Sequence, residues 1–159
     1  MNGSSLALSP TIGGFQDFVT NVMQIPVAAL PLGSLVVTYS FDFALDWVTQ
    51  VLCLVGGQPG AYSMYTRAVY NLAADTLINF ATDQSGQCFF SDLRKSYGCN
   101  SFVPGVISAT SDEGTSVSYQ VADSLKNLTV ANLQNLKTPY GRMYLGIVQS
   151  LGPTSWGLS

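Results

Sequence analysis

Few side chains in this sequence could take part in covalent chemistry. It contains no histidine, and its three cysteines are Cys53, Cys88 and Cys99. Without histidine, the chain lacks the usual general base and every Ser–His or Cys–His nucleophile pair. A zinc site would need all three cysteines and a carboxylate, and their spacing does not indicate one. We therefore predict no catalytic residue, no cofactor and no metal, and keep a cysteine-based enzyme as an alternative.

The cysteines themselves admit two structural interpretations. Cys88 and Cys99 are near enough in sequence to close a short disulfide loop. An odd and small number of cysteines argues against a disulfide framework, so buried free thiols are the preferred interpretation.

Charged residues are unusually scarce. They make up 9% of the 159 residues, whereas a typical soluble domain has roughly 25%. A surface so poor in charge is expected to be covered largely by partners. The net charge is −3, and the basic residues are scattered at Arg67, Arg94, Lys95, Lys126, Lys137 and Arg142. Because binding to phosphates needs clustered Lys and Arg, direct nucleic-acid binding is not predicted.

The most hydrophobic stretch, residues 34–54, also carries the carboxylates Asp42 and Asp46. At 21 residues it could span a bilayer, but each aspartate would cost about 2.5–3.5 kcal/mol there. A polar residue recurs at every fourth position, at Ser34, Thr38, Asp42, Asp46 and Gln50. This spacing predicts a central helix, buried on most sides, with one narrow polar stripe. The stripe is either the solvated side of the helix, which we prefer, or a surface that lines a channel or faces a neighbour in a ring. A membrane-associated protein is an alternative.

Helical spacing also predicts elements on either side of this stretch. Residues 1–14 are expected to form a flexible arm, and residues 15–25 a short helix. Residues 61–82 give the strongest helical pattern, with a core row at Tyr62, Tyr65, Val69, Leu72, Thr76 and Phe80. An outer row contains Arg67, Asn71 and Asp75. The break at 56–60 predicts an antiparallel pair with the preceding helix, and residues 83–103 are expected to form a loop.

The last third of the chain predicts a β-hairpin and then a capped helix. Alternation around a turn indicates the hairpin at about residues 104–121. Thr138 suits an N-cap and Pro139 the first helical position. The apolar face expected for this helix contains Tyr140, Met143, Tyr144, Ile147, Val148 and Leu151. The predicted fold is mainly α: a small helical bundle with an inserted β-hairpin, a single domain over residues 15–152, and a tail at 153–159.

The order of these segments resembles a family of tailed-bacteriophage head–tail adaptor, or connector, proteins. In that family, a helix with a small-residue segment precedes a Gly-Xaa-Val/Ile-Ser turn, a Ser-rich strand and a Thr-Xaa-Tyr-Gly helix start. The matching residues here are 72–76, 105–108, 115–119 and 138–144. Relatives often have histidine after the alanine pair, where this chain has Asp75.

The resemblance implies a structural virion protein without catalytic residues. Family members form rings, commonly of twelve copies, which join the portal to the stopper or tail in the virion neck and surround the DNA exit channel. Assembly in the host cytoplasm, no sequence-specific DNA binding and no membrane partner follow from this expectation. Another neck or tail component, such as a tail terminator, a stopper or a minor capsid protein, is the alternative.

The resemblance also suggests roles for particular residues. Family tails commonly dock on the portal, and the matching positions are Thr154, Ser155, Trp156, Gly157, Leu158 and Ser159. From the residues alone, a tail that folds back on its own domain is an equal alternative. Because a lone hairpin is marginally stable, the hairpin is expected to pack against its own helices or against an adjacent subunit. Its strand residues Val117, Tyr119 and Val121 are the candidates for contact with a neighbouring subunit. A mildly acidic lining would not retain passing DNA, and the candidates for it are Asp42, Asp46, Asp112 and Glu113.

Overall fold

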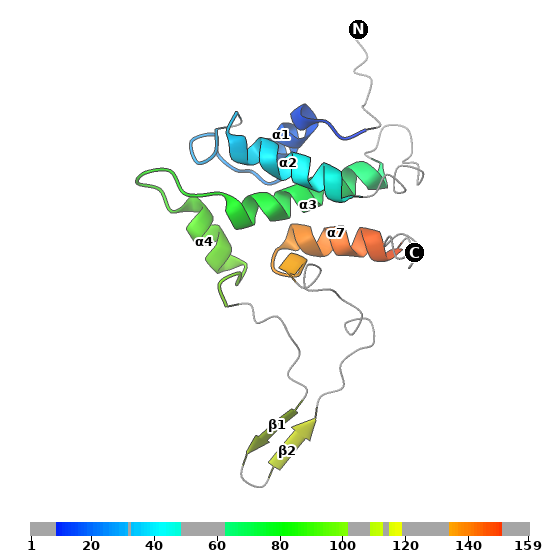
Figure 1. Cartoon of the computed structure of the whole chain (residues 1–159). Helices are drawn as coiled ribbons and strands as arrows, with labels where there is room; N and C mark the ends of the chain where they lie inside the picture. Colours follow the sequence, from blue (N-terminus) through cyan, green and yellow to red (C-terminus); the bar gives the residue numbers. More distant parts are fainter. Residues whose placement is uncertain are drawn as a thin grey trace.

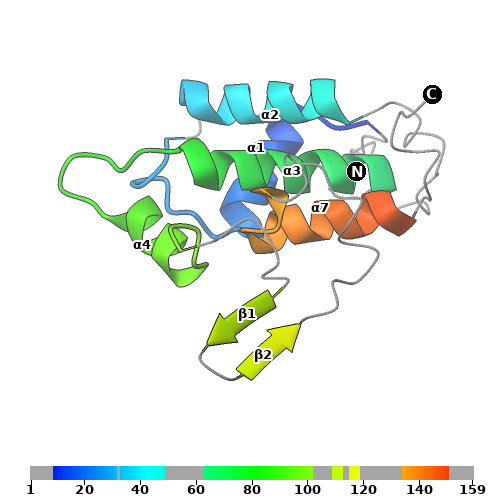
Figure 2. The ribbon, with the colours of Figure 1, turned by 60° about the horizontal axis from the view of Figure 1, so that its bottom comes forward.

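The fold is a layer of helices side by side, with a further helix behind the layer and a short one at its end (Figure 1). The computed structural model describes residues 9–31, 33–48, 63–101, 109–112, 115–118 and 134–150. The helices in these ranges are α1 (Ile12–Asn21), α2 (Leu35–Trp47), α3 (Met64–Phe80), α4 (Phe89–Ser96) and α7 (Pro139–Ser150). Figures 1 and 2 both place α3 between α2 and α7. The mainly helical fold class is thus confirmed.

Helix α3 is the centre of the core. All of its residues from Ala68 to Ile78 are buried. The small side chains of Ala68, Ala73 and Ala74 allow neighbouring helices to approach closely on several sides. Ser63 caps the helix by accepting a hydrogen bond from the N–H of Thr66. The predicted helix at 61–82 is confirmed as an element, with α3 lying inside those bounds.

Helix α1 is held to this core by aromatic rings. The Phe15 ring lies 6.0 Å from that of Phe41 and 5.9 Å from that of Tyr70 between centroids. The Tyr70 hydroxyl also donates to the carbonyl of Thr11, the N-cap of α1, at 3.2 Å. Helix α1 therefore begins at Ile12, inside the segment 1–14 that was predicted to be an arm.

A helix lies within residues 34–54, as predicted, but α2 is neither central nor buried on most sides. In α2 the buried residues are Val37, Ser40, Phe41 and Ala44, and the opposite side is open. That open side carries aromatic residues beside the predicted polar stripe. The stripe positions Thr38, Asp42 and Asp46 are exposed, and Gln50 lies outside the described residues. Hydrophobicity alone did not reveal the central helix, because α3 owes its position to small residues as much as to apolar ones.

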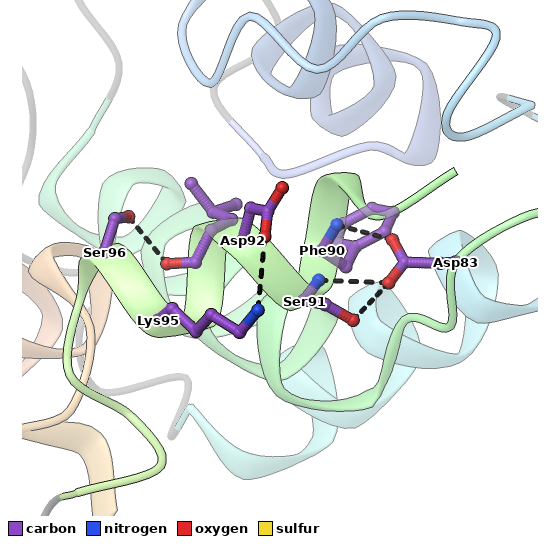
Figure 3. Close-up of polar contacts among 7 residues, drawn as sticks. Asp83, Phe90, Ser91, Asp92, Lys95 and Ser96 are labelled. Carbon is purple, nitrogen blue, oxygen red and sulfur yellow. Dashed lines mark hydrogen bonds and ion pairs between the residues drawn. The ribbon is translucent and has the colours of Figure 1, made fainter. Parts of the chain in front are cut away.

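A further difference is α4, which lies within residues 83–103, predicted to be a loop. Its first turn is capped from a distance by Asp83 (Figure 3). The carboxylate accepts hydrogen bonds from the backbone N–H groups of Phe90 (2.6 Å) and Ser91 (3.1 Å), and from the Ser91 hydroxyl. These bonds, the one from the Ser91 hydroxyl above all, hold the pKa of Asp83 below its usual range.

Arg94 of α4 contacts the end of α3. Its guanidinium donates to the carbonyls of Ile78 (2.9 Å) and Ala81 (2.8 Å) at the end of α3. These carbonyls lack partners within a helix, so Arg94 caps the C-terminus of α3.

The strands β1 (Ala109–Asp112) and β2 (Thr115–Ser118) pair in antiparallel register, with Thr110 opposite Val117. The remaining parts of the predicted span 104–121 lie outside the described residues. Among the helices that the structure describes, none combines the length and apolarity needed to cross a bilayer.

Candidate functional site

The start of α7 is locked onto α3 by one hydroxyl group. Thr138 is fully buried, and its Oγ1 accepts a hydrogen bond from the N–H of Gly141 at 3.0 Å. The same hydroxyl donates to Oδ1 of Asp75 on α3 at 2.5 Å. The predicted N-cap at Thr138 is confirmed, and it also acts as a tertiary contact that positions the whole helix.

Gly141 is required by this arrangement. A Cβ atom at this position would lie 2.0 Å from the carbonyl oxygen of Asn135 and 2.8 Å from Oδ1 of Asp75. Carbon atoms cannot approach an oxygen so closely, and the obstacle at Asn135 is backbone, which cannot rotate away. The Thr-Pro-Tyr-Gly sequence is therefore explained by local geometry: threonine caps, proline begins the helix, and glycine admits the preceding turn.

Asp75 is buried, with 4% of its surface exposed, although its spacing with Arg67 and Asn71 predicted an outer row. Asn71 is buried as well, whereas Arg67 is exposed. Burial raises the pKa of Asp75 from 3.8 to about 6, an effect moderated by the hydrogen bond from Thr138, the charge of Lys137 and the Asn79 side chain. The alanine pair just before Asp75 was a signal that this side of α3 is covered.

A groove of about 410 Å³ opens beside Asp75. Its floor is α3, with Leu72, Thr76 and Asn79, and the segment 134–137 forms one wall. The other wall is aromatic, contributed by Tyr39, Phe43 and Trp47 of α2, with Phe80 at the end of α3. Polar groups therefore lie at the floor of the groove and aromatic rings along its rim.

These aromatic side chains form a continuous exposed ridge. Tyr39, Trp47 and Phe80 keep 55%, 53% and 63% of their surface exposed. The rings of Tyr39 and Phe43 stack at 6.4 Å between centroids, and those of Phe43 and Trp47 at 5.8 Å. Phe80 meets Tyr39 edge to face at 6.2 Å. Because such rings are costly to leave in water, a ridge of this kind is typical of an interaction surface.

Two further predictions about which residues are buried are wrong. Phe80 was predicted in the core row of α3 but lies on the surface. Met143 was predicted on the apolar face of α7 but is 59% exposed, whereas Leu145, which the pattern missed, is buried. Tyr144 and Val148 are buried as expected, and burial raises the pKa of Tyr144, an effect that the nearby Trp47 side chain moderates.

The predicted site residues fall in different places. Asp42 and Asp46 are exposed on α2, one and three residues along the helix from the aromatic positions. Asp112 ends β1 opposite Thr115, and Val117 lies in β2. The remaining predicted positions lie outside the described residues: Glu113, Tyr119, Val121 and residues 154–159. The structure brings none of the described candidates into the groove.

The described cysteines are free thiols in two settings. Cys88 is exposed, contrary to the expectation of a buried thiol, and Cys99 is half-buried. The Cys99 thiol donates weakly to the carbonyl of Lys137 at 4.0 Å, and burial raises its pKa. Cys53 lies outside the described residues. Within the ranges that the structure describes, no three side chains of the metal-ligating kinds cluster together.

Compared with known proteins, the chain matches no family model, and no curated protein or solved structure is significantly similar to it.

Proposed function

We propose that the chain is a structural virion protein of a tailed bacteriophage, a ring-forming head–tail adaptor that joins the portal to the stopper or tail. The observation that carries the proposal is the exposed ridge of Tyr39, Phe43, Trp47 and Phe80. A small domain with so few charges and so much aromatic surface gains stability when other chains cover it. Such a surface is typical of a protein that functions within an assembly.

The resemblance to head–tail adaptor proteins indicates which assembly the chain would join. Its most distinctive piece, residues 138–144, forms the junction in which Thr138 caps α7 and bonds to Asp75. A motif that fixes the bundle in this way has a physical reason to recur among proteins of one fold. In this proposal, the hairpin at about 104–121 is inserted in the helical domain and contacts a neighbouring subunit through Val117, Tyr119 and Val121. The tail at 153–159 docks on the portal.

The proposed partners are further copies of the chain, the portal and a stopper or tail protein. DNA passes through the ring without sequence-specific contacts. Acidic side chains would suit the lining of such a channel, because they offer no cations to displace counterions from DNA. The candidates are Asp112, Glu113 and, where no neighbouring copy covers α2, Asp42 and Asp46.

The test is to locate the chain in particles. Virions of the phage that encodes it are imaged by cryo-electron microscopy, and necks released from them are analysed by mass spectrometry. We expect the chain to copurify with portal and to form a ring directly below it. A ring elsewhere in the neck or tail would support the alternative station. A chain that stays monomeric and never enters portal-containing particles would contradict the proposal.

A truncation separates docking from folding. Removing residues 153–159 is expected to reduce capture of the purified chain by portal while leaving its melting temperature within about 2 °C, because these residues lie beyond Ser150, the last residue of α7. An equal loss of docking and of melting temperature would argue against a docking tail.

A further inference from the structure

Helices α2 and α7 form opposite edges of the helical layer, with α3 between them (Figures 1 and 2). Each therefore has an outer side that faces away from the core. The residues on these two outer sides differ in size and in charge, and the differences are complementary.

The exposed side of α2 is large, apolar and acidic, and it extends from the outer edge of the helix to the wall of the groove formed by Tyr39, Phe43 and Trp47. We call it the α2 face, and its exposed residues are Leu35, Tyr39, Asp42, Phe43, Asp46 and Trp47. Leu35 keeps 87% of its surface in solvent. Within the described ranges, neither aspartate makes a hydrogen bond or an ion pair. Because the α2 face combines two carboxylates with aromatic rings, a complementary partner surface would offer both apolar contact and a cation.

The outer side of α7 is small and basic. We call it the α7 face, and its exposed residues are Arg142, Met143, Gly146 and Gln149. Positions 142, 146 and 149 share one side of the helix because they are spaced four and three apart. The Arg142 guanidinium donates to the carbonyl of Leu136 at 3.0 Å and has further N–H donors for another acceptor.

Gly146 has no close neighbour among the residues that the structure describes. A Cβ atom there would meet nothing within 4 Å, in contrast to Gly141 on the same helix. Glycine in a helix interior is destabilising relative to alanine, so its presence usually reflects close approach by another group. Because Gly146 is exposed, a second copy of the chain can supply that group, and the notch left by the missing side chain can accept a bulky ring.

We propose that the α2 face of one copy packs against the α7 face of the next, with the aromatic ridge seated over Gly146 and Asp42 and Asp46 facing Arg142. The interface rests on the proposed function, because it is the contact that would build the ring. Two different faces on opposite edges make a heterologous contact, which repeats from copy to copy and closes into a ring when the rotation allows.

Charge favours a second copy as the occupant. The α2 face is acidic and the α7 face is basic, so each supplies what the other lacks. Among the other cations of the described residues, Arg94 caps α3, Lys95 pairs with Asp92 at 3.5 Å, and Lys137 lies beside Asp75. Arg67 is exposed but belongs to the central helix α3, not to an outer helix. Arg142 is therefore the cation that a neighbouring copy can present from an outer helix face.

The test uses two variants, each of which blocks one face. The first carries Tyr39→Asp and Phe43→Asp on the α2 face, and the second carries Arg142→Asp and Gly146→Asp on the α7 face. Both blocked faces are acidic, so they repel each other. Masses are measured by light scattering after size exclusion up to millimolar concentration, and circular dichroism verifies the fold. Val27→Asp, at an exposed apolar position on neither face, is the matched control.

We expect the wild type and the Val27→Asp control to form multimers, each blocked variant alone to be monomeric, and their equimolar mixture to form a one-to-one dimer. A blocked variant that assembles like the wild type, a mixture without dimer, or a wild type that stays monomeric would overturn the inference. If the blocked variants do not fold, the milder Phe43→Ala and Gly146→Leu apply the same logic, with a tenfold or greater weakening expected for each alone and wild-type dimer affinity for the mixture.

The outcomes also separate this interface from the proposed function. If the chain occupies virion necks but both blocked variants enter the ring normally, the interface is wrong and the adaptor role stands. If the mixed dimer forms but the chain is absent from necks, the interface stands and the adaptor role is wrong.

Discussion

The Thr138 hydroxyl lies between the first turn of α7 and the carboxylate of Asp75 in the middle of α3, 63 residues earlier in the chain. It accepts the N–H of Gly141 at 3.0 Å and donates to Oδ1 of Asp75 at 2.5 Å. One side chain therefore both begins a helix and fixes its position on the core.

Replacing Thr138 with alanine should be strongly destabilising. The loss of an N-cap costs about 1 kcal/mol, and leaving the buried Asp75 carboxylate without its donor adds about 1–3 kcal/mol. We expect a total loss of about 2–4 kcal/mol in the free energy of unfolding, measured by urea denaturation. Thr138→Ser keeps the hydroxyl and is expected to retain most of the stability. Equal losses in the two variants would show that the methyl group, not the hydroxyl, matters.

Asp75 should make stability depend on pH. Its pKa is 3.8 in the unfolded chain and about 6 in the folded one, so folding favours the protonated form. The free energy of unfolding linked to Asp75 is greatest below about pH 4, decreases as the pH rises toward 6, and stays low above pH 6. Asp75→Asn should remove this dependence and raise stability at pH 7.5 by about 1–3 kcal/mol. Thermal unfolding of both proteins at pH 4.5 and 7.5 checks this, and parallel pH profiles would contradict it.

The sequence predicted the elements of this junction better than their relationship. Helices α3 and α7 were expected from their periodicity, and the α7 cap at Thr138 from its residue type. The burial of Asp75 was missed because the residue that compensates it lies far away in sequence, whereas local spacing grouped it with the exposed Arg67. A single sequence gives no measure of which distant polar groups meet.

Helix α4 and the surface of α2 were missed for related reasons. The cap of α4 comes from Asp83, which lies outside the first turn, so no local capping signal precedes Phe89. On α2, an apolar residue was assumed to be a core residue. Tyr39 and Trp47 are exposed instead, which is expected where another chain, rather than the same one, supplies the covering surface.

Arg94 should hold the end of α3 in place. One guanidinium nitrogen, Nη1, donates to both the Ile78 and the Ala81 carbonyl, and the planar guanidinium loses less side-chain entropy per hydrogen bond than a lysine ammonium does. Arg94→Lys is expected to increase amide hydrogen exchange in the last turn of α3 by about tenfold, which corresponds to about 1.4 kcal/mol of local stability. Lys95→Gln, next to it on an exposed side chain, is the control and should leave exchange there unchanged. Equal effects would rule out a specific capping role.

The two glycines of α7 should respond oppositely to alanine. At Gly141 the new Cβ would overlap the Asn135 carbonyl, so Gly141→Ala is expected to cost about 2–3 kcal/mol. At Gly146 the methyl group would stand in open space, and the gain in helix propensity should stabilise the isolated chain by about 0.5–1 kcal/mol. Chemical denaturation under monomeric conditions measures both. If Gly146→Ala raises this stability yet weakens self-association, the glycine serves the contact between copies; if it changes neither, the proposed notch has no role.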